Sequence, residues 1–181
     1  PEMTRFMELR LDALRANDSK AALQQGWVDY EHISPHLKRA LIAAEDSRFM
    51  QHDGFDWDGI EKALARNRRR GKIVAGGSTI SQQLAKNLLL TPDKTLWRKA
   101  QEAVITLMIE TTWSKRRILE VYLNVIEWGD GIFGAEAAAW HYFGVSAAQL
   151  SAEQAARLAA MTPRPRYFDA HRTSPILAAR S

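Results

Sequence analysis

The sequence lacks cysteine entirely, which excludes disulfide bonds, thiolate nucleophiles and cysteine metal ligands. This absence fits an oxidising and a reducing compartment equally well. No apolar run approaches the roughly 18 residues that a membrane-spanning helix needs, and no signal-peptide pattern is present. Because the chain begins with Pro1 and not with methionine, we expect that an N-terminal segment of the full-length protein is absent from it.

Long stretches of alternating polar and apolar residues are also absent, as are internal repeats and low-complexity blocks. Apolar residues recur instead at spacings of three and four, which predicts a mainly α-helical fold. A length of 181 residues suits one domain over residues 1–181. The 25 Lys and Arg residues exceed the 21 Asp and Glu residues, which favours anionic partners without choosing among phosphates, nucleic acid and a membrane surface.

Helical periodicity covers most of the chain. The expected helices span residues 4–15, 35–45, 58–67, 80–88, 97–112, 115–125, 135–142 and 151–161. The first of them either packs on the core or lies against lipid. In the fifth, we expect Val104, Leu107 and Met108 to turn inward. Residues 127–131 are typical of a turn.

The most informative segment covers residues 76–87, where two glycines precede a helix with a polar first turn. Thr79 followed by Gln82 predicts a capping box, and free N–H groups at a helix start attract an anion such as phosphate. At helical spacing Thr79, Gln82, Gln83 and Lys86 share one face. The segment is therefore either an ordinary helix start or a phosphate site that faces a cleft.

A second candidate site follows the helix of residues 35–45. Asp46 and Arg48 are predicted to form a structural pair that fixes the turn, and His52 to be a hydrogen-bonded wedge within it. Glu45 differs, because it follows two alanines on a largely apolar helix. A carboxylate with little room for water suits a general base or acid near neutral pH.

Two runs of positive charge remain open to more than one interpretation. Arg68–Arg70 belong to a run over residues 66–72, which predicts either a solvated loop or a mobile basic arm that meets phosphates. Lys115 and the two arginines after it crowd a helix start, where positive charge is unfavourable. They therefore bind an anion, or Glu120 and Glu127 compensate them.

A third group of cations surrounds a carboxylate. Arg98 lies four residues and Lys99 three residues before Glu102, so all three side chains share a helix face. This group is either a solvated ion-pair cluster or part of a site.

A resemblance to the peptidoglycan glycosyltransferase family rests on five blocks in the family's order, residues 45–54, 77–87, 98–102, 114–124 and 158–165. This family includes the transglycosylase domain of class A penicillin-binding proteins, and its stand-alone, monofunctional members look most similar. The resemblance implies a two-lobed, mostly α, lysozyme-like fold with a small mobile lobe beside the cleft. It also implies a single-pass N-terminal anchor in the bacterial inner membrane, with the catalytic domain on the periplasmic side.

The resemblance further implies an inverting glycosyltransferase that polymerises lipid II into β-1,4-linked glycan strands and releases polyprenyl pyrophosphate. Glu45 would be the general base. Glu102 would be the second catalytic carboxylate, which orients basic groups or holds a divalent cation, Mg²⁺ or Mn²⁺; no organic cofactor is expected. The implied partners are lipid II, the growing strand, the membrane surface and cell-division or elongation proteins, and they include no nucleic acid.

The resemblance also implies roles for further individual residues of this chain. The implied substrate-binding residues are Ser78, Thr79, Gln82, Gln83, Lys86, Asn87, Lys94, Arg98, Lys99, Lys115 and Asn124. The structural positions of the motifs are Asp46, Arg48, Phe49, His52 and Gly54. This chain departs from the family's pattern at Lys94, where an arginine is frequent, and at Arg164, where an asparagine is common. Lysine keeps the charge at position 94 but lacks the two-pronged hydrogen bonding of arginine.

Two other functions compete with this interpretation. A lysozyme-type or lytic transglycosylase also uses a glutamic acid in a helical cleft, but it leaves the cations around Glu102 unexplained because cleavage needs no pyrophosphate site. A basic helical module that binds nucleic acid accounts for Arg68–Arg70. It gives no role to Glu45 or Glu102.

Overall fold

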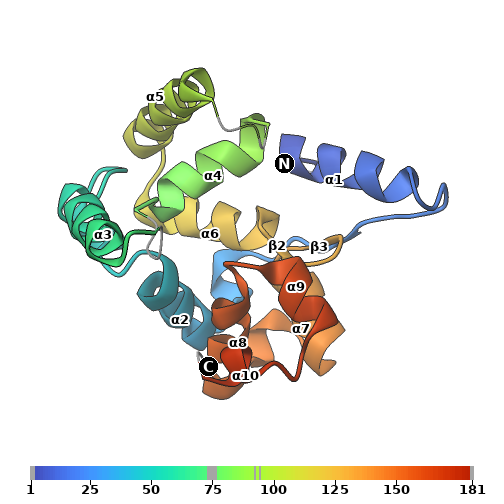
Figure 1. Cartoon of the computed structure of the whole chain (residues 1–181). Helices are drawn as coiled ribbons and strands as arrows, with labels where there is room; N and C mark the ends of the chain where they lie inside the picture. Colours follow the sequence, from blue (N-terminus) through green and yellow to red (C-terminus); the bar gives the residue numbers. More distant parts are fainter. Residues whose placement is uncertain (1–2, 73–76, 92, 94, 180–181) are drawn as a thin grey trace.

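The structure is a computed structural model that describes residues 3–72, 77–91, 93 and 95–179. It is mainly α-helical, as the periodicity predicted (Figure 1). The helices are α1 (Arg5–Arg15), α2 (Pro35–Glu45), α3 (Trp57–Arg70), α4 (Ile80–Leu89), α5 (Leu96–Thr112), α6 (Lys115–Val125), α7 (Ala135–Phe143), α8 (Ala152–Met161), α9 (Pro165–Ala170) and α10 (Pro175–Ala178). The strands are β1 (Gln24–Gln25), β2 (Glu127–Gly129) and β3 (Ile132–Phe133).

The helices form two groups around α6. In Figure 1, α4 and α5 lie above α6, whereas α2, α7, α8, α9 and α10 lie below it. Within the upper group α4 packs on α5, α6 and α1, and within the lower group α2 packs on α8. This arrangement agrees with the expected two-lobed, lysozyme-like fold.

Short polar side chains begin the helices where the sequence predicted. Ser34 Oγ accepts a hydrogen bond from the backbone in the first turn of α2. Thr79 and Gln82 form a reciprocal capping box at α4, and Ser151 and Gln154 form the same motif at α8. These predicted helix starts are confirmed.

A small three-stranded sheet includes part of the turn predicted at residues 127–131. The strand order is β1-β3-β2, with β1 parallel and β2 antiparallel to β3. Strands of two or three residues are too short to produce an alternating pattern, so periodicity could not reveal them. The turn itself connects β2 to β3, where Gly131 has a φ of +75°.

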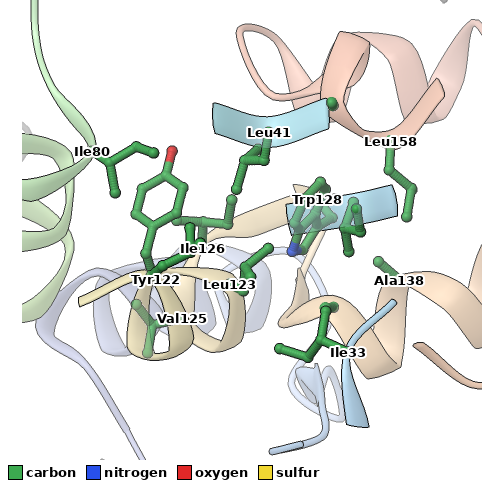
Figure 2. Packing of buried hydrophobic residues seen from close by; sticks show 14 of the residues in the cluster. Ile33, Leu41, Ile80, Tyr122, Leu123, Val125, Ile126, Trp128, Ala138 and Leu158 are labelled. Atoms are coloured by element: carbon green, nitrogen blue, oxygen red, sulfur yellow. The ribbon is translucent and has the colours of Figure 1, made fainter. Parts of the chain in front are cut away.

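The core is centred on α6, whose residues 118, 119 and 121–125 are all buried. Figure 2 shows Tyr122 pointing from α6 toward Ile80 of α4 and Leu41 of α2. A helix that is buried on all sides must be enclosed by other elements. Burial of α6 therefore joins the upper and lower groups of helices.

The predicted inward face of α5 is wrong. Val104, Leu107 and Met108 are 58%, 52% and 61% exposed. α5 instead packs on the rest of the protein along the stripe of Glu102, Thr106 and Ile109, which are spaced four and three residues apart and are buried. Because Glu102 and Thr106 are polar, the pattern of apolar residues in the sequence did not mark this face as buried. The outward residues, together with Leu96 and Trp97, form an exposed surface that we call the α5 apolar face.

The predicted basic loop is wrong as well. Arg68–Arg70 form the last turn of α3, and Gly71 ends the helix with a φ of +61°. The three arginines are exposed. Cations in the last turn of a helix are favoured by its dipole, which explains why the helix extends through them. Within the part of the chain described here, no helix has the length and apolar character needed to cross a membrane.

Candidate active site

Glu45 is the last residue of α2, and three other elements orient its half-buried side chain. Its Oε2 accepts a hydrogen bond from Gln83 Nε2 of α4 at 2.8 Å, and its Oε1 accepts one from Thr162 Oγ1, just after α8. Tyr122 of α6 donates its hydroxyl proton to Gln83 Oε1 at 2.8 Å. Both carboxylate oxygens are therefore held in place while the residue remains partly open to solvent.

A pocket of about 330 Å³ adjoins this carboxylate. Both hydrogen-bond partners of Glu45 line the pocket. Its other walls come from α1, α4, α6, β2, α9 and the segment that connects α8 to α9, namely Phe6, Lys86, Asn87, Tyr122, Ile126, Glu127, Pro163, Arg164, Pro165, Arg166 and Tyr167. The pocket is thus positively charged and extends to the two side chains, Gln83 and Thr162, that hold Glu45.

Lys86 is a partly buried cation in the wall of this pocket. Among the described residues, no hydrogen bond or ion pair reaches its ammonium group. Burial lowers the pKa of Lys86 below its ordinary value; Glu102 and Glu45 oppose this decrease, and the positive charges of Arg98 and Lys99 add to it. An ammonium group that has lost water without gaining a direct bond to an anion stands to gain free energy from an anionic ligand.

Glu102 lies behind this cation on α5 and is 3% exposed. Its Oε2 accepts a hydrogen bond from Arg98 Nη1 at 2.7 Å, and its Oε1 accepts one from Lys99 Nζ. The predicted sharing of one helix face is therefore confirmed. The burial of Glu102 argues against a fully solvated cluster.

The same contacts test Glu102 as a ligand for a divalent cation. Both of its oxygens already bind cationic side chains. Among the described residues, no group of three or more His, Cys, Asp and Glu could hold a metal ion. These residues do not fit a metal bound to Glu102, because a divalent ion would have to displace two cations and would find no second carboxylate.

Of the two interpretations of the start of α4, the structure supports an ordinary capped helix start and not an open anion site. The N–H of Ile80 donates to Asp46 Oδ2 at 3.0 Å, and the N–H of Thr79 donates to Gln82 Oε1 at 3.0 Å. Thr79 Oγ1 donates to Gly54 O at 2.6 Å. Thr79 and Gln82 are 2% and 5% exposed, so these groups stabilise the fold instead of facing the cleft.

Asp46 does not pair with Arg48, contrary to the prediction. Its carboxylate lies 2.9 and 3.0 Å from His52 Nε2, which confirms His52 as a hydrogen-bonded wedge. Arg48 instead binds Asp56 and Asp58 at the start of α3. Sequence proximity suggested the wrong pair because Asp46 turns inward to α4 and Arg48 turns outward.

The two remaining structural positions of this motif behave as predicted. Phe49 is completely buried in the core. Gly54 has a φ of +93°, and a Cβ atom there would lie 2.8 Å from Thr106 Cγ2. Only glycine fits at this point, where the loop meets α5.

Two of the predicted substrate-binding residues have structural partners instead. Asn124 is completely buried; its Oδ1 accepts from Val28 N, and its Nδ2 donates to Val28 O and Glu120 O, all at 2.8 Å. Lys115 Nζ binds Glu110 Oε1 at 2.7 Å and lies over the ring of Phe49. Complete burial closes Asn124 off from substrate, contrary to the prediction, whereas Lys115 remains partly exposed and its substrate contact stays a prediction.

The arginines after Lys115 are compensated, as one of the two interpretations predicted. Arg116 pairs with Glu31 and Arg117 pairs with Glu120. Glu127 does not take part, since it binds Arg10 and Arg166. The start of α6 therefore offers no cluster of unpaired cations.

The remaining predicted substrate-binding residues lie in different places. Ser78 is exposed, and Gln83 and Asn87 line the pocket with Lys86. Lys94 lies outside the described residues. Thr162 and Arg166 were missed by the sequence analysis, because Thr162 looked only like a helix end and nothing in the local pattern marked Arg166. Distant contacts alone bring them to the site.

Together, the fold and the pocket define a helical cleft enzyme with an oriented carboxylate beside an unpaired cation. A family model described as Transglycosylase matches residues 13–181, almost the whole chain. The chain therefore belongs to the transglycosylase family.

Curated relatives share most of the sequence. A biosynthetic peptidoglycan transglycosylase of Dechloromonas aromatica (strain RCB) is 64% identical over 174 residues, which cover 96% of this chain and 75% of the relative. A protein of the same name from Nitrosospira multiformis is 62% identical over 178 residues, covering 98% of this chain and 77% of the relative. Another, from Chromobacterium violaceum, is 61% identical over 178 residues, which cover 98% of this chain and 78% of the relative.

Proposed function

We propose that this protein is a peptidoglycan glycosyltransferase that polymerises lipid II into glycan strands of the bacterial cell wall. Family membership and the names of its relatives support glycan-strand synthesis. In the proposed reaction, the 4-hydroxyl of an incoming lipid II attacks the anomeric carbon of the growing strand. A β-1,4 bond forms, the α-linked pyrophosphate leaves on its polyprenyl carrier, and the configuration inverts.

Glu45 is the general base in this reaction. The hydroxyl that attacks must lose a proton as its oxygen bonds to carbon, and Glu45 Oε1 or Oε2 receives it. Gln83 and Thr162 fix the carboxylate plane, so no reorientation is needed at the moment of transfer. The half-buried position leaves one side of Glu45 open for the incoming sugar.

Lys86 stabilises the leaving pyrophosphate. Negative charge accumulates on the phosphate oxygens as the bond to the sugar breaks, and a desolvated ammonium group stabilises that charge more strongly than one in water. Glu102 holds Arg98 and Lys99 in the same region and thereby orients further cations. Any divalent ion that takes part would be bound mainly by the pyrophosphate and not by Glu102.

One observation carries this proposal: the α4 residue that holds the Glu45 carboxylate and the unpaired cation Lys86 lie on the same face of α4. Gln83 binds Glu45, and Lys86 follows Gln83 by three residues, less than one turn of α4. A cleaving enzyme requires an acid but no cation for a phosphate leaving group. The unpaired charge therefore favours synthesis over cleavage, and the relatives' names do the same.

We also propose that the catalytic domain works at the periplasmic surface of the inner membrane, where its lipid-linked substrate resides. The α5 apolar face supports this location, because exposed apolar side chains gain free energy by entering the boundary of a bilayer. Arg68–Arg70 on α3 add positive charge that anionic head groups attract.

Glu45→Gln tests the proposed base. The substitution keeps the size of the side chain and removes its ability to accept a proton at neutral pH, so we expect at least about a 1,000-fold loss of turnover. The measurement is a gel of labelled lipid II in detergent, with and without a divalent cation, before and after lysozyme digestion. Glu153→Gln on the exposed start of α8 is the matched control and should polymerise normally.

Each outcome of this experiment decides between the candidate functions. Lysozyme-sensitive polymer from the wild type alone supports both the reaction and its base. Substantial polymer from Glu45→Gln would remove Glu45 as the base. If neither protein polymerised but the wild type released fragments from isolated cell-wall glycan, the cleaving enzyme would replace the proposal. If the wild type acted on neither lipid II nor cell-wall glycan but bound labelled oligonucleotides tightly, the result would favour a nucleic-acid-binding module.

A further inference from the structure

The hydroxyl group of Thr162 lies between two acceptors. Thr162 Oγ1 is within hydrogen-bonding distance of Glu45 Oε1 and 2.8 Å from the backbone oxygen of Ala159. A hydroxyl has one proton to donate and two lone pairs that accept. It cannot satisfy both oxygens fully while Glu45 is ionised. When Glu45 is protonated, the carboxyl group itself supplies the second proton.

We infer that Thr162 is a positioning residue that keeps Glu45 hydrogen-bonded before and after proton transfer. Before transfer, Thr162 donates to the carboxylate. Once Glu45 is protonated at Oε1, its new O–H donates to Thr162 Oγ1, and Thr162 turns its own proton to Ala159 O. Only protons move in this exchange, so the heavy atoms of the base stay in place through the reaction.

The other contacts of Glu45 cannot do this. Gln83 Nε2 can only donate, and Tyr122 holds the Gln83 amide in that orientation by donating to its oxygen. Among the described residues that hydrogen-bond to Glu45, Thr162 alone can reverse direction. The charged or titratable groups that influence the base are Lys86 on α4, Tyr122 on α6 and the neighbouring Asp46, and burial raises the pKa of Tyr122 so that it stays neutral.

This inference rests on the proposed function, in which Glu45 accepts the proton of the attacking hydroxyl. It adds a residue from the segment between α8 and α9 to a site otherwise built from α2, α4 and α6. That segment also lines the pocket through Thr162, Pro163 and Arg164. The position of the base is therefore coupled to the wall that the incoming sugar would contact.

Thr162→Val tests the inference, because valine matches threonine in size and lacks the hydroxyl. We expect kcat with lipid II in detergent to fall about 10-fold, KM to change by less than about twofold, and the acid limb of the kcat profile to move to higher pH by about one unit. The limb moves upward because valine removes both bonds, and the bond that Thr162 donates to the charged carboxylate is stronger than the one it accepts from the neutral carboxyl group. Thr162→Ser restores the hydroxyl and should restore both kcat and the profile.

Thr112→Val is the matched control. The Thr112 hydroxyl donates to Met108 O at 2.6 Å at the end of α5, so its loss removes the same kind of helix-end bond without touching a carboxylate. Its pH profile should match that of the wild type. Thermal melting would confirm that each variant is folded, and Thr162→Ala gives the same readout if the valine variant is not.

Three results would overturn the inference. A wild-type kcat and pH profile for Thr162→Val, alongside an inactive Glu45→Gln, would remove Thr162 from the site and leave the proposed function intact. A serine variant as impaired as the valine variant would show that packing, and not the hydroxyl, matters. An active Glu45→Gln variant would overturn the proposed base and this inference together.

Discussion

The two halves of α4 differ in whether their polar groups have partners within the protein. In the first turn, the N–H groups of Thr79 and Ile80 find acceptors within the protein, and the side chains that cap the helix are buried. One turn later, Gln83 reaches into the cleft to hold Glu45, and Lys86 has no partner among the described residues. Satisfied polar groups stabilise the fold, whereas an unsatisfied one is available to a ligand.

The same division separates two adjacent carboxylates. Asp46 is 7% exposed and joins His52 to the start of α4. Glu45, one residue earlier, is half-buried and adjoins the pocket. The two carboxylates are therefore neighbours at the end of α2, yet Asp46 is a structural link and Glu45 is a candidate base. Variants of each region should therefore alter either stability or activity, and not both equally.

Asp46→Ala should give the largest effect on stability, about 3 kcal/mol in the free energy of unfolding. The substitution leaves the N–H of Ile80 and the ring of His52 without their acceptor in a buried place. Urea denaturation followed by circular dichroism measures the loss. Asp93→Ala, at an exposed position, is the control and should change stability by less than about 0.5 kcal/mol. An equally stable Asp46→Ala variant would contradict the structural role.

Lys86→Met should show the opposite behaviour, with kcat/KM for lipid II reduced about 100-fold and stability unchanged or slightly raised. The lowered pKa of Lys86 means that the folded protein disfavours its charged form, so a neutral side chain removes a cost. The lowered pKa also means that Lys86 loses its charge at a lower pH than an ordinary lysine. Activity should therefore fall on the alkaline side before exposed lysines titrate.

Steady-state kinetics and thermal melting check this pair of effects. Lys62→Met, on the exposed side of α3, is the matched control, because it removes a lysine that is not buried. Normal activity in Lys86→Met would contradict the pyrophosphate role. A strongly lowered melting temperature would mean that Lys86 has a structural partner after all, and the contrast between the two halves of α4 would disappear.

Local sequence signals predicted much of the fold. Helix starts at Ser34, Thr79 and Ser151 were correct because a cap depends on residues only two or three positions away. The shared face of Arg98, Lys99 and Glu102 was correct for the same reason. Local pattern also singled out Glu45 as a candidate acid or base, whereas the particular reaction and the role of Glu45 as its general base came from the family resemblance.

Errors arose where the partner is distant in the sequence. Asn124 looked available to substrate, yet it is occupied by Val28, 96 residues away. Thr162 looked like a helix end, yet it contacts Glu45, 117 residues away. The buried stripe of α5 contains Glu102 and Thr106, so a rule that places only apolar residues inward selected the wrong face. Contacts of this kind depend on tertiary packing and leave no local pattern.

Thr79→Ala gives the smallest of these effects and separates the two roles that sequence alone left open for the start of α4. If Thr79 only caps the helix and binds Gly54 O, its loss should cost about 1 to 2 kcal/mol of stability and leave the KM for lipid II unchanged. Ser151→Ala removes the equivalent cap of α8, far from Glu45 in sequence and outside the pocket, and calibrates that cost. A rise in KM for Thr79→Ala beyond that of Ser151→Ala would return Thr79 to the substrate site, because loss of a cap alone affects both variants alike. An unchanged KM would limit the reactive part of α4 to Gln83, Lys86 and Asn87.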